Sequence, residues 1–158
     1  MLTWRLQSDD MPPVLALRSN PVHRSGALEI SFFEHGDALC KLRNRTDGRL
    51  HQLVDDSTSF LETSATAMTL TALATAAARG VIPRASWVTS CVNDLWRGLS
   101  AAVAADGSVA GICEGGGIWP DAADYKARPT AYEASACGGL GAVLYAADAM
   151  REFALVTG

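Results

Sequence analysis

The sequence lacks the features that mark several classes of protein. Its 13 lysines and arginines stand against 17 aspartates and glutamates, a formal net charge of −4 in 158 residues. Because nucleic-acid binders and polybasic membrane modules need a cationic face, we expect neither kind of partner. No apolar run approaches the roughly 20 residues that span a bilayer. The start lacks the pattern of a signal peptide, which favours a cytoplasmic location if Met1 is the true first residue; the compartment otherwise stays open.

Cysteine and histidine are scarce and scattered. Cys40, Cys91, Cys113 and Cys137 stand far apart, with no C-x-x-C pair and no Cys/His spacing of a metal site. Cys40 and Cys91 fall in apolar helical stripes, where a free cysteine behaves as a small buried hydrophobe. We therefore expect buried free thiols at these two positions. The alternative is a disulfide, whose pairing the sequence does not assign.

What is present suits one domain with a core. Hydrophobic residues make up 49% of the chain and charged residues 19%, which excludes wholesale disorder. Apolar spacing predicts helices over about 24–43, 59–79, 83–106 and 134–153. The residues expected to face inward are Leu28, Phe32, Leu39 and Leu42, then Leu61, Ala65, Met68, Ala72, Leu73 and Ala76, then Val88, Cys91, Val92, Leu95, Leu99 and Val103, and last Leu140, Val143, Leu144, Ala147 and Met150.

The signals at the helix ends complete an all-α architecture. Ser59 with Glu62 three residues on has the spacing of a capping box, and Gly80 stands where a terminating glycine would. The many alanines of residues 65–78 predict close approach to a neighbouring helix. We expect consecutive antiparallel helical hairpins over 23–158, an irregular N-terminal segment over 1–22, and one long loop or short extended segment near 106–130.

Two loops carry the polar and aromatic groups from which a site could be built. The first, residues 47–56, holds His51 and Gln52, and the second, residues 111–132, holds Trp119, Tyr125 and Arg128. Aromatic faces pack on the C–H side of a sugar ring, and charged groups bond hydroxyls and pair with uronate carboxylates. These loops therefore favour a carbohydrate site.

Other polar and aromatic residues have plainer interpretations. Asp55-Asp56 before a helix is typical of a turn with favourable dipole placement rather than an acid/base pair. Glu62 is expected to act as a helix cap, and Trp87 and Trp96 as packing residues. The glycines at 115–117 form a turn but no phosphate loop, because no Lys-Ser/Thr follows them.

Several short motifs occur together in the order of one enzyme family. Residues 47–56 read DGRLHQLVDD and residues 60–68 read FLETSATAM; YKARPT follows at 125–130 and GGLGAVL at 138–144. As a set they resemble the closing part of the unsaturated rhamnogalacturonyl and glucuronyl hydrolases, glycoside hydrolase families 105 and 88. The resemblance covers roughly residues 25–150.

This resemblance implies a fold and a reaction. The fold is a partial (α/α)6 toroid. The reaction is hydration of the 4,5-double bond of an unsaturated uronic acid on a small pectin-derived oligosaccharide, in which an aspartate protonates the vinyl ether and activates water. That chemistry uses no metal and no organic cofactor. The implied partner is an oligosaccharide with an unsaturated uronic acid, and the expected substrate-binding residues are His51, Gln52, Trp119, Tyr125 and Arg128.

The departures from the family pattern matter as well. Arg49-Leu50 stands where the family has Leu-Trp, so we expect an aromatic sugar platform to be missing there. The catalytic aspartate and the Trp-x-Arg-Gly-x-Gly-Trp segment of the family's N-terminal half are not found. No residue is therefore assigned as catalytic, and the isolated chain is expected to be inactive.

Three hypotheses follow. The chain is the C-terminal part of such a hydrolase; or it is a non-catalytic helical module that binds carbohydrate or self-associates through exposed apolar helix faces; or it is an unrelated helical domain. The first predicts exposed apolar patches on the helices that flank the missing part.

Overall fold

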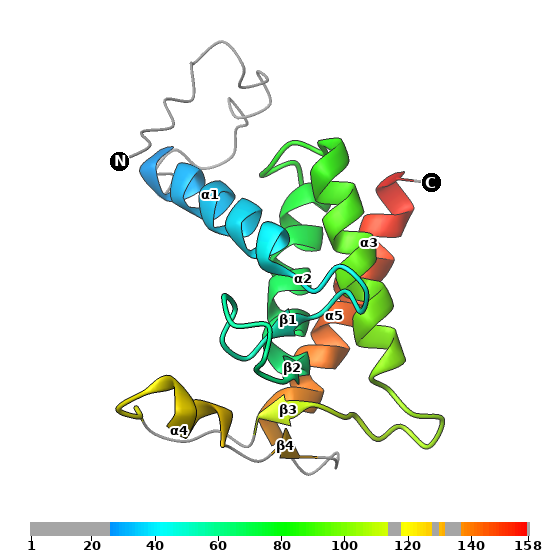
Figure 1. The fold of residues 1–158 in the computed structure, drawn as a ribbon. Helices are drawn as coiled ribbons and strands as arrows, with labels where there is room; N and C mark the ends of the chain where they lie inside the picture. The colour runs from blue at the N-terminus through cyan, green and yellow to red at the C-terminus, as the bar shows by residue number, and fades with distance from the viewer. Residues whose placement is uncertain (1–25, 114–117, 128–129, 132–136, 158) are drawn as a thin grey trace.

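Four long helices form the described part of the chain (Figure 1). The computed structural model describes residues 26–113, 118–127, 130–131 and 137–157. The long helices are α1 (Gly26–Leu42), α2 (Thr63–Ala78), α3 (Ser86–Ala101) and α5 (Cys137–Thr157). The predicted all-α class is confirmed. The predicted irregular segment 1–22, the turn at 115–117 and Arg128 lie outside the described residues.

Short strands occur only at the loops among these residues. β1 (Leu50–His51) pairs antiparallel with β2 (Leu61–Glu62), with Leu50 opposite Glu62. β3 (Ile112–Cys113) pairs antiparallel with β4 (Thr130–Ala131), with Ile112 opposite Ala131. A short helix, α4 (Ala122–Lys126), lies between β3 and β4. The extended segment expected near 106–130 is therefore present, whereas α4 was not expected between the two X-Pro pairs that flank it.

Consecutive long helices run in opposite directions, as predicted. In Figure 1 α2 and α5 run upward and α3 runs downward. α2 packs most extensively against α5, its parallel neighbour. The ion pair between Arg79 and Glu152, 3.1 Å apart, joins the C-terminal ends of these two helices. Because α2 and α5 are parallel, both helices begin at the same end of the molecule.

The core lies between α2, α3 and α5. The side chains of Leu70, Val92 and Leu95 are at most 1% exposed, and each such burial contributes about 1.5–3 kcal/mol. Where α2 meets α5 the buried side chains are short, among them Ala74 and Ala146. This is the close approach that the alanine-rich stretch predicts.

Two of the predicted inward faces are partly wrong. Met68 of α2 is 58% exposed and Leu144 of α5 is 64% exposed; Ala72 and Ala147 are exposed beside them. Both helices are apolar around most of their circumference, so apolar spacing does not select one face. α3 has polar residues between its apolar positions, and its predicted face is confirmed from Val88 to Leu99. Leu42 and Val103, also expected inward, are 41% and 38% exposed.

Helix ends follow some sequence signals and not others. Gly80 has φ of +69° directly after the end of α2, as expected. The predicted capping box is wrong, because α2 begins at Thr63 and Glu62 itself is the N-cap residue. Ser59 instead donates its hydroxyl proton to the carbonyl of Asp56 at 2.8 Å. α3 is shorter than predicted at both ends, and α5 extends four residues farther, to Thr157.

A disulfide joins α1 to α3. Cys40 and Cys91 are bonded, with their Cα atoms 5.7 Å apart, and are 3% and 0% exposed. Their predicted burial is confirmed, but the expectation that they are free thiols is wrong. The two positions are 51 residues apart in sequence, and no local pattern indicates that α1 and α3 are neighbours. None of the described helices combines the length and apolarity that crossing a bilayer requires.

Candidate functional site

The two loops singled out in the sequence meet at one end of the helices (Figure 1). The first, residues 43–62, is called the anchored loop here; the second contributes residues 118–127, called the α4 segment. The amide of Cys113, in β3, donates to Glu62 Oε1 at 3.1 Å, and the amide of Thr63 donates to the carbonyl of Gly111 at 2.8 Å. These bonds bring β3 against the start of α2.

Glu62 is the centre of this junction. Its side chain is 4% exposed. The carboxylate accepts hydrogen bonds from the amides of Ser64 and Ala65, from the Ser64 hydroxyl at 2.7 Å, and from the amide of Cys113. A buried carboxylate needs such donors to remain charged. Both oxygens are engaged, so Glu62 is itself the cap of α2, rather than the predicted cap partner of Ser59, and it also holds β3.

Arg49 fills the space between the anchored loop and α2. Its Nε lies 2.8 Å from Asp47 Oδ1, its Nη2 donates to Asp47 Oδ2 at 3.1 Å, and its Nη1 donates to Thr63 Oγ1 at 3.1 Å. Hydrogen bonds from Arg49 hold the pKa of Asp47 below its ordinary value. Two glycines make room for the side chain, because a Cβ at Gly98 would lie 2.9 Å from Arg49 Cγ and one at Gly111 3.0 Å from Arg49 Nη1.

Leu50 stands where the family pattern has tryptophan. Its side chain is 1% exposed and belongs to the core cluster, while its amide donates to Thr66 Oγ1 at 2.9 Å. Position 50 therefore faces the core in this chain. Leucine in place of tryptophan at position 50 therefore changes the packing of the core and not the exposed surface of the loop. The expectation that a sugar platform is lost at this position is corrected.

Both ring nitrogens of His51 are used within the anchored loop. Nδ1 lies 2.7 Å from the carbonyl of Ser59, so Nδ1 carries the proton. Nε2 lies 3.3 Å from Asn44 Nδ2, and the orientation of that amide is set because Asn44 Oδ1 accepts from the amides of Thr46 and Asp47. The imidazole is 7% exposed. These contacts show that His51 holds the shape of the anchored loop.

Gln52 reaches across to β3. Its Nε2 donates to Cys113 Sγ at 3.6 Å, and Cys113 is a free, half-buried thiol. Gln52 Oε1 is shielded from solvent and has no hydrogen-bond partner among the described residues. Gln52 thus contacts the second loop at β3.

The α4 segment carries the two described aromatic candidates. Asp121 caps α4 by accepting from the amide of Asp124 at 2.9 Å. The amide of Trp119 donates weakly to the Tyr125 hydroxyl at 3.4 Å, and both rings are half-buried. The segment is therefore built around a contact between its two aromatic residues.

One ion pair fastens the α4 segment to the anchored loop. Lys126 Nζ lies 2.9 Å from Asp56 Oδ2 and 3.0 Å from Thr58 Oγ1. Hydrogen bonds from Thr58 first, and from Lys126 second, hold the pKa of Asp56 well below its usual range. Asp56 is thus a turn residue, as expected, and also a loop contact that was missed. The sequence signal that could have found this contact is the opposite charge of Asp56 and Lys126, which stand on the two loops expected to form one site.

The predicted site residues therefore divide into groups. His51 and Gln52 lie in the anchored loop, and Trp119 and Tyr125 lie in the α4 segment fastened to it; Arg128 lies outside the described residues. No group of three or more His, Cys, Asp or Glu side chains suited to a metal ion occurs within the described ranges. The arrangement is a frame for aromatic and polar contacts, and no acid/base pair is identified in it.

Away from this end, an apolar groove runs between α1 and α2. One hollow of about 560 Å³ is lined by residues that include Phe32, His35 and Val81. A second, of about 220 Å³, lies between Leu39 on α1 and Met68 and Ala72 on α2. The side chains predicted to face a core thus line an open groove here.

Comparison with known proteins gives the following matches. The profile of Glycosyl Hydrolase Family 88 matches residues 21–153. The fold is similar to that of a possible member of the GH105 family from Salmonella enterica serovar Paratyphi A, with 24% identity and a TM-score of 0.73 over 88% of this chain. It is also similar to a GH105 glycoside hydrolase from C. acetobutylicum, with 20% identity and a TM-score of 0.71 over 89% of this chain.

A possible GH105 member from Klebsiella pneumoniae gives a similar result, with 20% identity and a TM-score of 0.69 over 88% of this chain. A search of curated proteins gives no match. The chain spans only 35–41% of the length of these three solved structures. It therefore has the fold of part of such a protein.

Proposed function

Because the chain belongs to glycosyl hydrolase family 88, we propose that it is part of a glycosidase that acts on small oligosaccharides ending in an unsaturated uronic acid. Family membership sets aside the hypothesis of an unrelated helical domain. The observation that carries the proposal is the junction of the anchored loop with the aromatic α4 segment, at the end where α2 and α5 begin.

In this proposal the chain supplies one wall of the substrate site. Trp119 and Tyr125 pack against the sugar ring, and Gln52 bonds its hydroxyl groups. Arg128, three residues beyond Tyr125, pairs with the uronate carboxylate. His51 contributes by holding the loop, since both of its ring nitrogens are already bonded.

The acid/base step is assigned to a carboxyl group outside these residues. Hydration of the vinyl ether needs one group that donates a proton to carbon and activates water. Glu62 and Asp47 are bonded to their own donors, and Asp56 is paired with Lys126. In the whole protein, further helical hairpins cover the groove between α1 and α2 and bring the missing carboxyl group. The exposed Met68 and the apolar groove support this placement.

The second candidate function is a non-catalytic module that binds carbohydrate or associates with itself. The exposed apolar residues of α5 favour it: Leu144, Tyr145 and Leu155 are 64%, 72% and 75% exposed. Such side chains mark contact surfaces when they gather on one element. The two candidates differ in what the isolated chain does with a sugar and with a second copy of itself.

Calorimetric titration with an unsaturated galacturonyl-rhamnose disaccharide, combined with a turnover assay, tests whether the isolated chain carries part of the substrate site, and sedimentation analysis tests the self-association form of the second candidate. We expect binding without turnover, weakened by at least about tenfold in Trp119→Ala and Tyr125→Ala, the scale of one lost aromatic contact. Tyr145→Ala is the matched control, because it removes an exposed tyrosine of α5 and should leave binding unchanged.

Each other outcome has a definite meaning. Turnover by the isolated chain would place the acid/base group within it and contradict the assignment above. Absence of binding, together with a dimer in sedimentation analysis, would favour the self-association module. The saturated disaccharide tests whether the double bond and its planar carboxylate contribute to recognition.

A further inference from the structure

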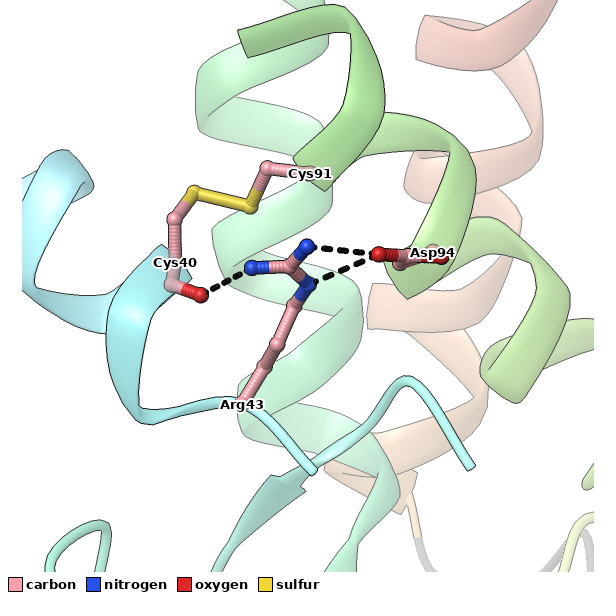
Figure 2. Close-up of a disulfide and its surroundings, with 4 residues drawn as sticks. All are labelled: Cys40, Arg43, Cys91 and Asp94. Atoms are coloured by element: carbon pink, nitrogen blue, oxygen red, sulfur yellow. Dashed lines mark hydrogen bonds and ion pairs between the residues drawn. A yellow bond between two sulfur atoms is a disulfide. The ribbon is translucent and has the colours of Figure 1, made fainter. Parts of the chain in front are cut away.

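Two links of different kinds join α1 to α3, and they lie side by side (Figure 2). One is the Cys40–Cys91 disulfide. The other is the ion pair of Arg43 with Asp94, in which Nη2 and Nε lie 2.6 and 3.0 Å from Asp94 Oδ2. On α3 Asp94 follows Cys91 by three positions, one turn along, and Arg43 follows Cys40 by three positions, directly after the end of α1. The two links therefore form a single clamp at the C-terminal end of α1.

The clamp is shielded from water. Cys40, Cys91 and Arg43 are 3%, 0% and 8% exposed. Arg43 Nη1 also donates to the carbonyl of Cys40, so the guanidinium connects both halves of the clamp. Hydrogen bonds from Arg43 hold the pKa of Asp94 below its ordinary value. The Arg43–Asp94 half of the clamp is thus an ion pair in which Arg43 is the buried member.

The anchored loop begins directly at this clamp. Asn44 follows Arg43; its amide donates to the carbonyl of Arg49 at 2.8 Å, and its side chain reaches His51. The loop also rests on α3, because Arg97 Nη1 donates to the carbonyl of Thr46 at 2.6 Å. The position of His51 therefore depends on α1 and α3 staying together at this point.

We propose that the Cys40–Cys91 disulfide is a redox-dependent clamp for the anchored loop. With the bond intact, the end of α1 and residues 44–52 are held on α3. With the bond reduced, this region loosens while α2 and α5, which pack most extensively on each other, stay folded. Disulfides persist in oxidising surroundings, so the clamp is closed there and opens under reducing conditions.

The chemistry of opening is a two-electron reduction by an external dithiol. Its thiolate attacks one sulfur of the Cys40–Cys91 bond to give a mixed disulfide, and the second thiol displaces the remaining protein thiolate. The products are two protein thiols and the oxidised dithiol. Because both sulfurs are buried, attack requires local separation of α1 from α3, so the rate reports how firmly the ionic half holds.

Hydrogen exchange measured by mass spectrometry tests this proposal on the full chain. Dithiothreitol, or the double substitution Cys40→Ala with Cys91→Ala, should accelerate amide exchange in residues 36–52 by about tenfold or more. Peptides from α2 and α5 should keep their protection. Unchanged exchange in residues 36–52, or equal acceleration throughout the chain, would overturn the proposal.

Three controls make the result specific. Dithiothreitol should have no further effect on the double variant, which separates reduction of this bond from other actions of the reagent. Cys113→Ala, which removes a free thiol, should leave the protection of residues 36–42 unchanged. Arg43→Met should accelerate reduction of the disulfide severalfold, whereas Arg151→Met, at an exposed pair on α5, should not. Equal reduction rates in these two arginine variants would contradict a shared clamp.

Discussion

The anchored loop and the α4 segment meet at one end of the molecule but are held in opposite ways. In the anchored loop, Arg49, His51 and Glu62 are mostly buried, and each makes two or more hydrogen bonds within the protein. The α4 segment has no buried residue in its helix, and Lys126 links it to Asp56 and Thr58 through side chains that are partly exposed.

This difference separates two tasks that a binding site combines. The anchored loop has its polar groups satisfied before any ligand arrives, so it supplies rigid shape. The α4 segment keeps Trp119, just before its short helix, and Tyr125, within the helix, half-exposed. Under the function proposed above, the aromatic contacts to a sugar therefore come from the less firmly held region.

Removing the N-cap carboxylate of each region, Glu62 or Asp121, gives the largest expected difference in unfolding free energy. Glu62→Ala removes a buried acceptor of four hydrogen bonds, leaves the amide of Cys113 unpaired, and should cost about 2–4 kcal/mol of unfolding free energy. Asp121→Ala removes an exposed cap of a five-residue helix and should cost at most about 0.5 kcal/mol. Urea denaturation of both variants checks this; comparable losses would mean that the α4 segment is as integral as the anchored loop.

The next largest difference in unfolding free energy is expected between substitutions of Arg49 and Lys126. Arg49→Met leaves Asp47 without its partner and Thr63 Oγ1 without a donor, and should cost about 1–3 kcal/mol. Lys126→Met breaks a pair whose side chains are 36% and 30% exposed, and should cost less than about 1 kcal/mol. Raising the salt concentration should weaken only the second link. A salt-independent effect of Lys126→Met would show that its link is not an exposed ion pair.

The smallest expected difference is in how stability falls with pH, and it concerns single aspartates. The folded-state pKa of Asp94 is lowered by Arg43 from a value of 3.8. The unfolded chain therefore binds the proton first as pH falls, and the stability that Asp94 contributes is present above about pH 4 and lost below it. Asp94→Asn should flatten the loss of stability between pH 5 and pH 3. Asp56→Asn should also flatten this loss, but less, because the hydrogen bonds from Thr58 that chiefly lower the pKa of Asp56, and its pair with Lys126, are exposed to solvent and salt. Identical curves for Asp94→Asn and the unmodified chain would remove Asp94 from this account.

Some of these features could be predicted from sequence because local chemistry determines them. The alternating polar and apolar residues of α3 fix its inward face, and Gly80 ends α2 because only glycine enters a left-handed conformation without strain. Others depend on contacts distant in sequence. The inward faces of α2 and α5 are selected by packing on each other, and the partner of Cys40 by the approach of α1 to α3.

The candidate site divides in the same way. The loops that form it were recognised from their composition, and the placement of Trp119 and Tyr125 in one of them follows. The roles within the anchored loop could not be read from the sequence. His51 looks like a ligand contact until Asn44 and Ser59 are seen to bond both of its ring nitrogens, and Glu62 looks like a partner in a cap until it is found to be the cap.

The glycines around Arg49 carry a consequence for how this protein can diverge. A Cβ at Gly48 would lie 2.0 Å from the carbonyl oxygen of Asp94, on top of a φ of +105°, whereas Gly107 has open space around it. Gly107 has a φ of +85°, so a side chain there would strain the backbone despite the open space, whereas a side chain at Gly48 would in addition part the anchored loop from α3. The stretch that carries Gly48 is therefore less able to accept substitution than the turn at Gly107.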